Sequence, residues 1–380
     1  MDNLTHSFVG LAAAKAGLER ASPYATAVCV IAANAPDADI ATLIRGRWTY
    51  LENHRGLTHS ILGTFTLALL IPVLFYAGDR LIARLRATPP RARFNGLLLA
   101  SLVLSASHPL LDWTNSYGLR PLLPWSARWY YGDLVFIVDP WIWLSVGGAA
   151  FLLTARTTGR LLAWAFLALA LTIAIVILPR GGASVPVASR LLWVAGIAGL
   201  IIAYRAGVIA RWGAGVAAVS LALIVVYWGA LDLAHHYALA RAQMIAQQDA
   251  EQNKESLIRV AAMPMLANPL RWECVAETDR AVERFDLSLG SAATQVPHSA
   301  VRYEKPRGDA AAWINRIGQQ DRRARIFLNF ARFPVTRLER GCAGETLAQF
   351  ADLRFTEPGR GQSNFALEIS VPQSSSSEAP

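Results

Sequence analysis

The chain has 380 residues, of which 54% are hydrophobic and only 17% are charged. A soluble protein of this size ordinarily carries about a quarter charged residues, so this composition argues against one. The formal charge is +9, but no basic stripe alternates with exposed aromatic residues, and we expect no nucleic-acid partner. Apolar blocks fill residues 61–234 and charged residues follow them, which predicts a membrane domain and then a water-facing domain.

Two short apolar helical stretches, Thr5–Leu18 and Tyr24–Ala35, begin the chain. Each is too short to span a bilayer, which needs about twenty residues, so we expect a half-spanning or buried hairpin. Asp2 and His6 are unlike the start of a cleavable signal sequence. Six longer stretches are predicted to span the membrane, namely Ile61–Ala77, Asn95–Trp113, Leu134–Leu153, Leu161–Leu178, Leu191–Tyr204 and Trp212–Leu231.

The predicted fold class is mainly α, a polytopic α-helical membrane domain followed by a small β-rich (α+β) soluble domain. We predict a membrane domain at 1–234, a connecting helix at 235–263, the β-rich domain at 264–373 and a disordered tail at 374–380. The expected strands are Trp272–Thr278, Ala281–Leu289, Ala324–Phe333, Leu347–Phe355 and Phe365–Val371. Cys274 and Cys342 could form a disulfide if this domain lies in an oxidising compartment.

Polar residues form four clusters at the edges of the apolar segments, at 3–7 (NLTHS), 34–39 (NAPDAD), 53–60 (NHRGLTHS) and 108–113 (HPLLDW). Ionisable side chains persist at membrane depth where they pair, line a cavity or bind an ion. His108 and Asp112 are four residues apart and share one face of a helix. Asp37 and Asp39 follow Pro36 and are expected on a loop. Two carboxylates this close repel each other unless a cation lies between them.

His54 and His59 flank a turn at Gly56, and Thr58 is a candidate cap for the following helix. Each residue alone is a weak signal, but together the clusters predict a metal site. The predicted ligands are His6, Asp37, Asp39, His54, His59, His108 and Asp112. Mixed imidazole and carboxylate ligands favour zinc, with manganese or iron as alternatives. Seven ligands exceed the need of one tetrahedral ion, so one or two ions are expected.

The four clusters, in this order, resemble the signature blocks of the YdjM/YfhP-type membrane-bound metal-dependent hydrolases over about residues 1–150. The HRGLTHS block at 54–60 is the most specific. The family also tends to carry an Asp-rich segment after the HPxxD block, which Gly132–Pro140 matches, so Asp133 and Asp139 are expected to support the ligands or to act as further ligands. The resemblance implies an inner-membrane hydrolase. A distant likeness to the zinc phospholipase C and nuclease fold would imply phosphoester chemistry.

Two functions are compatible with these residues, and a third is disfavoured. In a metal-dependent hydrolase, Asp37, Asp39 and Arg55 are the catalytic candidates, and the substrate is a lipid or amphiphile beside the membrane lipids. Arg55 would either hold a phosphate or pair with a carboxylate such as Asp37. The alternative is a non-catalytic metal-binding membrane protein: a sensor, a carrier or a structural site. A transporter is disfavoured because charges are nearly absent from the later spans and no inverted repeat is visible.

The dense basic loop from Arg80 to Arg93 indicates which side of the membrane is cytoplasmic. Arginine and lysine accumulate in cytoplasmic loops, so we expect this loop inside. His54, His59 and Asp112 then lie on the opposite side if the two flanking spans are antiparallel. We therefore expect the metal site and the C-terminal domain on the periplasmic or outer face of a bacterial inner membrane.

Overall fold

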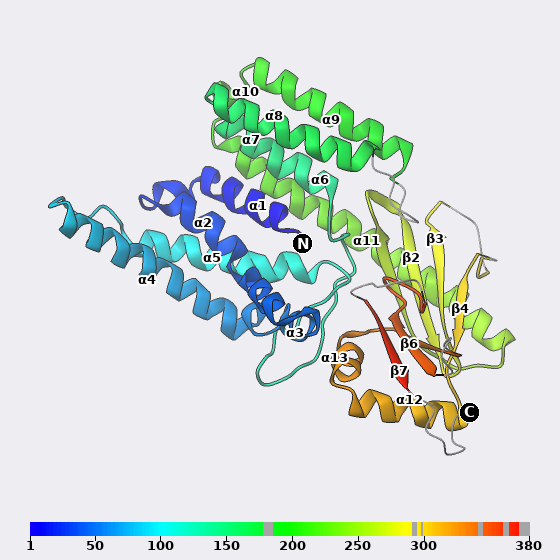
Figure 1. The fold of residues 1–380 in the computed structure, drawn as a ribbon. Coiled ribbons are helices and arrows are strands. Elements are labelled where there is room, and N and C mark those ends of the chain that lie inside the picture. The colour runs from blue at the N-terminus through cyan, green and yellow to red at the C-terminus, as the bar shows by residue number, and fades with distance from the viewer. Residues whose placement is uncertain (178–184, 291–294, 298, 341–344, 360–364, 372–380) are drawn as a thin grey trace. The chain divides into compact units, whose positions relative to one another are not determined.

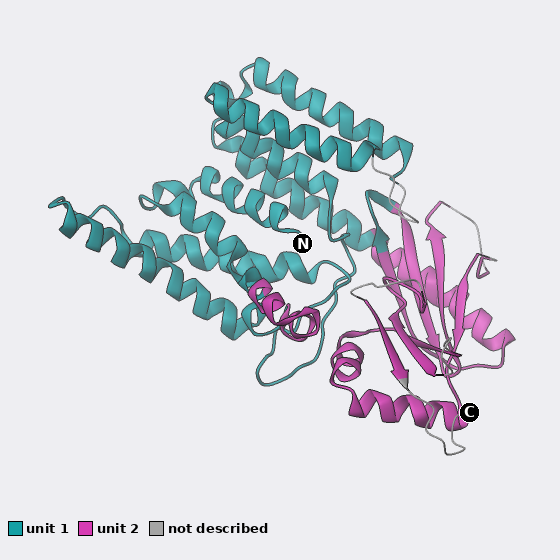
Figure 2. Cartoon of the chain, viewed as in Figure 1, with its two compact units in different colours: residues 1–39, 55–233, 264–269 teal, residues 40–54, 234–263, 270–380 magenta. Residues whose placement is uncertain are grey.

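Two compact units make up the chain, and Figure 1 shows its helices and strands in order. The structure, a computed structural model, describes residues 1–177, 185–290, 295–297, 299–340, 345–359 and 365–371. Unit 1 comprises residues 1–39, 55–233 and 264–269 (teal in Figure 2), and unit 2 comprises residues 40–54, 234–263 and 270–380. Most of the apolar helices lie in unit 1, and most strand residues lie in unit 2.

The chain begins with the expected helical hairpin. Its elements are α1 (Asn3–Ala16), η1 (Leu18–Arg20), α2 (Ala25–Asn34) and the 3-10 helix η2 (Ala35–Arg45). A loop was expected after Pro36, but α2 continues directly into η2. Gly10 lets α1 approach α2 closely, because a Cβ at this position would lie 2.9 Å from the carbonyl oxygen of Cys29. Small residues at such contacts are typical of helices that pack within a membrane.

Helices α4 (Ile61–Leu85) and α5 (Phe94–Trp113) form a second hairpin, and Figure 1 shows them side by side. α4 runs past the predicted end at Ala77. The buried carboxylate of Asp79 stabilises the connection, because its Oδ2 accepts hydrogen bonds from the backbone N–H groups of Arg91 at 2.7 Å and Ala92 at 2.8 Å. These two hydrogen bonds hold the basic loop, which connects the C-terminus of α4 to the N-terminus of α5.

The prediction of a span at Leu134–Leu153 is wrong. The helical segment begins only at Pro140 and consists of α6 (Pro140–Ile142), a π-helical stretch η4 (Trp143–Gly147) and α7 (Gly148–Thr154). Asp139 caps it by accepting hydrogen bonds from the backbone N–H groups of Trp141 at 2.8 Å and Ile142 at 3.1 Å. Because Pro140 has no N–H to donate, it suits the first position of a helix and disfavours an earlier start.

The remaining helices of unit 1 follow the predicted apolar stretches. They are α8 (Thr158–Thr172) with a π-helical end η5 (Ile173–Ile177), α9 (Val187–Arg205), α10 (Val208–Trp212) and α11 (Gly215–Gln252). No proline interrupts α11, and it continues from unit 1 into unit 2 without a break. The separate connecting helix predicted at 235–263 is therefore wrong, since this region holds the end of α11 and the strand β1 (Leu257–Met265).

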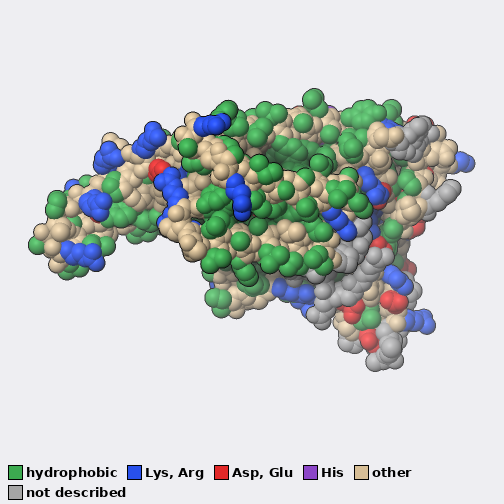
Figure 3. All heavy atoms as spheres, turned by 90° about the horizontal axis from the view of Figure 1, so that it is seen from above, with side chains coloured by type: hydrophobic (Ala, Val, Ile, Leu, Met, Phe, Trp, Pro, Cys, Tyr) green, Lys and Arg blue, Asp and Glu red, His purple; other side chains and the backbone are tan. Residues whose placement is uncertain are grey.

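Six helical segments within the described residues are long and apolar enough to cross a membrane: Ala25–Arg45, Ile61–Leu85, Phe94–Trp113, Thr158–Ile177, Val187–Arg205 and Gly215–Gln252. The number equals the predicted one, but Ala25–Arg45 takes the place of Leu134–Leu153. η2 lengthens α2 to 21 residues, whereas the Asp139 cap shortens the other segment. Figure 3 shows hydrophobic side chains over much of the helical face that it displays, as expected for helices surrounded by lipid.

The β-rich C-terminal part is confirmed. After β1, its strands are β2 (Asn268–Thr278), β3 (Ala281–Ser288), β4 (Val301–Glu304), β5 (Pro334–Arg340), β6 (Thr346–Asp352) and β7 (Ala366–Val371). One sheet has the order β1-β2-β3-β4 and the other the order β5-β6-β7. Two helices, α12 (Gly308–Gln320) and α13 (Arg322–Phe330), lie between them in sequence, and α13 contacts α3 (Arg47–Asn53) within unit 2.

The predicted strand Ala324–Phe333 is wrong, because most of it is the helix α13. Asp321 caps this helix by accepting a hydrogen bond from the Arg323 backbone N–H at 2.6 Å. Its buried residues recur at helical rather than alternating spacing, as Ala324, Phe327 and Phe330 do. β1, β4, β5 and α12 were not predicted. Cys342 and the tail Ser374–Pro380 lie outside the described residues, so the predicted disulfide and disordered tail stay predictions.

Candidate metal centre

Four of the predicted ligands gather where α4 begins and α5 ends. Asp37 comes from η2, His59 from the short 3-10 helix η3 (Leu57–His59), and His108 and Asp112 from the last turns of α5. One ligand atom from each of them lies within 4.8 Å of the others. All four side chains belong to unit 1, and only Asp37 keeps some exposure, with 13% of its side chain accessible.

The distances within this cluster are those of ligands around one ion. His59 Nε2 lies 3.2 Å from His108 Nε2, 3.3 Å from Asp37 Oδ1 and 3.4 Å from Asp112 Oδ2. His108 Nε2 lies 3.6 Å from each of the same two carboxylate oxygens. Two ligands about 2.0–2.1 Å from a tetrahedral zinc ion are about 3.3 Å apart. The four atoms therefore fit a single divalent ion at their centre.

The hydrogen bonding of His108 leaves one nitrogen free for a metal. His108 Nδ1 lies 2.6 Å from the carbonyl oxygen of Ala33 at the end of α2. A carbonyl oxygen only accepts hydrogen bonds, so Nδ1 carries a proton and donates it. In the neutral ring, Nε2 then holds a lone pair directed at the cluster, which is the arrangement that orients metal-bound histidines in proteins.

Asp112 supplies a carboxylate oxygen, Oδ2, that is available as a metal ligand. Its Oδ2 is buried and accepts no hydrogen bond within the described residues, although Arg55 Nε lies 3.1 Å away in an unfavourable orientation. A buried carboxylate oxygen without a hydrogen bond is costly. The imidazole nitrogens of His59 and His108 face this atom. A cation among them would compensate that cost.

Local backbone features place His59 at the cluster. Gly63 lets the first turn of α4 pass close to η3, because a Cβ there would lie 1.9 Å from the carbonyl oxygen of Leu57. Ser60, and not Thr58 as predicted, caps α4 by accepting a hydrogen bond from the Gly63 N–H at 3.1 Å. Thr58 instead donates its hydroxyl to Asp39 Oδ2 at 3.2 Å and contacts His59 Nδ1 at 3.0 Å.

Two carboxylates of η2 hold the two nitrogens of the His59 ring. Asp37 Oδ1 faces Nε2, and Asp39 Oδ2 lies 3.3 Å from Nδ1. Burial acts to lower the pKa of His59, but hydrogen bonds to Asp112, Asp37 and Asp39 outweigh it and raise the pKa to about 10. Asp39 therefore orients the ring from the side away from the cluster, as outer carboxylates do for metal-bound histidines.

His6 joins the site from α1. Its ring stacks on that of His108, with centroids 3.8 Å apart and an angle of 15° between the planes. His6 Nε2 lies 3.3 Å from Asp112 Oδ1, the carboxylate oxygen that does not face His59. His6 Nδ1 is buried and has no hydrogen-bond partner among the described residues. In this geometry His6 contacts a proposed ligand and flanks the set of four.

Arg55 is buried and contacts Asp112 instead of Asp37. Its Nη2 donates to Asp112 Oδ1 at 3.2 Å, and its Nη1 donates to Asn115 Oδ1 at 2.8 Å. The guanidinium also lies 4.7 Å from the ring centre of Tyr117. This arrangement favours the structural role that was weighed for Arg55. Sequence reasoning missed Asn115, although its place just after the HPxxD block was a usable signal.

The structure does not bring the other predicted residues into the four-ligand set. His54 belongs to unit 2, where its ring stacks on Tyr50 with centroids 4.6 Å apart. Asp139 caps α6 and accepts a hydrogen bond from the Tyr227 hydroxyl at 2.9 Å. Asp133 is buried beside the end of α5, since the following backbone N–H of Leu134 donates to the Thr114 carbonyl at 2.7 Å. Direct ligation by these three stays a prediction.

Comparison with known proteins supports the resemblance for the first part of the chain. Residues 1–183 match a family described as "YdjM inner membrane protein". This part of the chain is therefore similar to that family. The Uncharacterized protein YfhP of Bacillus subtilis (strain 168) is 29% identical over 153 residues, which cover 38% of this chain and 44% of YfhP. The match thus spans less than half of that relative, and no solved structure matches significantly.

The matched residues 1–183 contain all four residues of the cluster. Together with the apolar helices, this match identifies a multi-pass membrane protein. His59, His108 and Asp112 lie in the HRGLTHS and HPLLD blocks, and Asp37 lies in the NAPDAD block. The family description and the name of the relative state no reaction, so the chemistry of the site has to be argued from its own residues.

Proposed function

We propose that this protein is a membrane-bound metal-dependent hydrolase that acts on a phosphoester or another ester of a lipid or amphiphile. One observation carries the proposal: Asp37, His59, His108 and Asp112 present four ligand atoms at the spacing of one ion, and one of the four side chains reaches the surface. A largely buried set of ligands with one member accessible to solvent is a candidate active site.

The donor set fits a divalent ion of intermediate softness. Two imidazole nitrogens and two carboxylate oxygens favour zinc, with manganese or iron as alternatives. When bound, such an ion would lower the pKa of a coordinated water and polarise a phosphoryl or acyl oxygen. The seven predicted ligands allowed two ions, but the four-residue set accounts for one.

The surrounding residues have distinct proposed roles. Asp37 is the most accessible of the four proposed ligands. We assign it the role of general base, which removes a proton from the attacking water. Asp39 holds the His59 ring through Nδ1, and Arg55 balances the charge of Asp112. Asp39 and Arg55 thus position the reacting groups and do not touch the substrate.

A non-catalytic metal site is the second candidate, and the ligand number favours it. Four protein ligands complete a tetrahedral shell, which is usual for structural zinc, whereas catalytic sites keep an open position. Hydrolysis at this site therefore requires a fifth position or the movement of one ligand. Asp37 is suited to move because it is the least buried of the four.

We further propose that the site faces the periplasm or cell exterior. The Asp79-bound loop between α4 and α5 is rich in arginine, and the cluster lies at the opposite ends of the same helices. The positive-inside tendency then places the loop in the cytoplasm. A substrate would reach the site from the outer leaflet or from the periplasm.

The experiment that tests this function begins with full-length protein purified in detergent and loaded with zinc or manganese. Hydrolysis of bis(p-nitrophenyl) phosphate, p-nitrophenyl esters and phospholipids is measured for the wild type, for Asp37→Asn and for His108→Ala. The proposal expects metal-dependent turnover of at least one substrate, which both variants lose. Stoichiometric metal without turnover of any substrate would instead identify the non-catalytic site.

A further inference from the structure

An apolar groove opens between α4 and α5 and reaches the cluster of His and Asp ligands. Its volume is about 600 Å³, within the usual range for ligand pockets. Phe65 from α4, with Leu102 and Ala106 from α5, forms part of its wall. His59 also lines it. The groove and the proposed catalytic centre therefore share one side chain.

The groove runs along two helices that are candidate membrane spans. Its polar end is His59, where α4 begins, and its α4 wall extends from Ile61 to Ala68, about 10 Å along the helix axis. Ile61 and Phe65 are 65% and 55% exposed, and at membrane depth such surface faces hydrocarbon. A lipid head group at the cluster would thus continue into an acyl chain beside these residues.

One polar group within the groove lacks a partner. Thr64 lines the groove, and its hydroxyl is buried without a hydrogen-bond partner among the described residues. A buried hydroxyl without a hydrogen-bond partner is unfavourable. It lies on the first turn of α4, five residues after His59. A carbonyl oxygen there would satisfy it.

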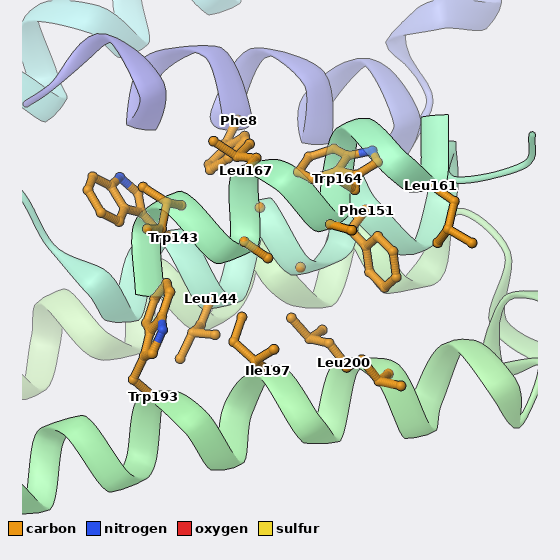
Figure 4. Close-up of a pocket in the computed structure, with 16 residues that line it drawn as sticks. Phe8, Trp143, Leu144, Phe151, Leu161, Trp164, Leu167, Trp193, Ile197 and Leu200 are labelled. Atoms are coloured by element: carbon orange, nitrogen blue, oxygen red, sulfur yellow. The ribbon is translucent and has the colours of Figure 1, made fainter. Parts of the chain in front are cut away.

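A second apolar cavity lacks the polar end that His59 gives to the groove. Figure 4 shows this cavity, of about 270 Å³, between side chains that include Phe8, Trp143 and Trp193. None of its 16 lining residues is ionisable. The indole N–H of Trp193 is already bonded to Thr172. This cavity offers hydrocarbon alone, so it supplies a control and not a second site.

We propose that the α4–α5 groove binds the acyl chain of a membrane amphiphile whose ester or phosphoester lies at the metal cluster. The inference rests on the proposed function for the reaction, but not for binding. It excludes small water-soluble esters as the preferred substrate class. It also assigns Thr64 the role of a positioning residue that donates its hydroxyl to the linkage oxygen.

The test fills each cavity with the same substitution. Ala106→Phe places a ring in the groove, and Ala165→Phe places one in the cavity of Figure 4; both alanines are exposed on membrane helices. Full-length protein is reconstituted in phosphatidylcholine vesicles that contain a phosphatidylcholine with a diazirine on its acyl chain. After illumination, labelled peptides are quantified by mass spectrometry. Metal content is measured in parallel to confirm that Ala106→Phe leaves the cluster intact.

The expected result is stronger labelling of α4 and α5 groove peptides than of α8 peptides, which report ordinary surrounding lipid. Ala106→Phe should reduce groove labelling several-fold, and Ala165→Phe should not. Equal labelling of groove and α8 peptides, or no effect of Ala106→Phe, overturns the inference. If turnover exists, Ala106→Phe should lower kcat/KM for long-chain phospholipid roughly tenfold or more by misplacing the linkage. Ala165→Phe, outside the groove, should leave turnover of both phospholipid and bis(p-nitrophenyl) phosphate unchanged.

These readouts separate the two proposals. Groove labelling without turnover of any substrate refutes the hydrolase and leaves the lipid site standing. Turnover without preferential groove labelling supports the hydrolase and removes the acyl-chain site. Thr64→Val should raise KM for the phospholipid, while Thr64→Ser should restore it, which a merely structural role of the methyl group would not produce.

Discussion

His59 Nε2 and His108 Nε2 face each other at 3.2 Å in the interior of the protein. Because His108 already donates its Nδ1 proton to Ala33, its Nε2 is an acceptor in the neutral ring. Protonation of both Nε2 atoms would set two donors against each other. A proton on His59 Nε2 that is donated to His108, or a cation shared by the two nitrogens, avoids this, and the first predictions test for the cation.

Removal of either histidine should abolish metal binding. We expect the wild type to hold about one equivalent of zinc or manganese, as one four-ligand set requires. His59→Ala and His108→Ala should each retain less than about a tenth of that amount. Elemental analysis of purified full-length protein measures the content. His236→Ala is the matched control, because His236 lies on α11 in unit 2, and an equal loss there would contradict the assignment.

Asp39→Asn should weaken metal binding without preventing it. The variant keeps the four proposed ligands but loses the carboxylate beside His59 Nδ1. Loss of such an outer partner typically lowers affinity about 10–100-fold. Competition with a chelator measures the change, and saturation at high metal should still reach one equivalent. An affinity equal to that of the wild type would show that Asp39 does not orient the ring.

Arg55→Met should destabilise unit 1 strongly. It leaves Asp112 as a buried carboxylate without its guanidinium partner, and breaking a buried pair in this way costs about 3–5 kcal/mol. Thermal unfolding in detergent should show a clear fall in Tm. The double variant Arg55→Met with Asp112→Asn should recover part of it, since the unpaired carboxylate is then neutral, although the buried Met1 ammonium loses its contact with Asp112. Arg86→Met, at an exposed arginine of the basic loop, should leave Tm nearly unchanged.

Reporter fusions decide the sidedness. Alkaline phosphatase inserted after Trp125, which is exposed in the segment that follows the cluster, should be active, because we place the metal site outside the cytoplasm. The same reporter inserted after Thr88, in the basic loop, should be inactive, whereas a GFP inserted there should fluoresce. The reverse pattern at both positions would show that the metal site faces the cytoplasm.

The C-terminal part should be more stable at mildly acidic pH through Glu273. Burial raises the pKa of Glu273 to about 7 from an ordinary value of 4.5, although Arg284 opposes the shift. Between these values the folded state binds more protons than the unfolded state, so this contribution is complete below about pH 4.5 and is lost as pH rises through 7. Glu273→Gln should flatten the pH dependence.

Hydrogen exchange of β2 peptides at pH 5 and pH 8, corrected for the intrinsic rate, measures this effect. The wild type should lose protection at pH 8 by more than the Gln variant does. Glu339→Gln, at an exposed glutamate of β5, is the control and should behave like the wild type. A pH dependence that is identical in all three proteins would refute the role of Glu273.

The positions of helices could be predicted from the sequence where hydropathy alone determined them. Long apolar stretches such as those of α5 and α9 have few alternatives to a spanning helix, so their positions were predicted well. The span at 134–153 failed because hydropathy ignores the Asp139 cap, and Pro140 starts the helix late. The strand predicted at 324–333 failed because a short run rich in aromatic and aliphatic residues suits both patterns, and Asp321 decided for a helix.

The site was predictable as a set of residues but not as a geometry. Charges beside apolar segments drew attention to His59, His108 and Asp112, and the structure brings these together. Which atoms contact one another could not be predicted from the sequence. The carbonyl group that orients His108 belongs to the backbone of Ala33, and a backbone carbonyl gives no sequence signal. The partner of Arg55 was not predictable from proximity in the chain, because Asp112 is 57 residues away whereas Asp39 is 16 residues away.

The four members of the cluster come from segments that are far apart in the chain, from Asp37 in η2 to Asp112 at the end of α5. A ribosome therefore delivers the last of them only after the first hairpin and α4 have left the exit tunnel. The site cannot exist in a nascent chain that has not yet inserted α5. A metal ion that binds at that moment would fasten η2, η3 and α5 together, so metal supply during synthesis would influence how much of this protein survives quality control in the membrane.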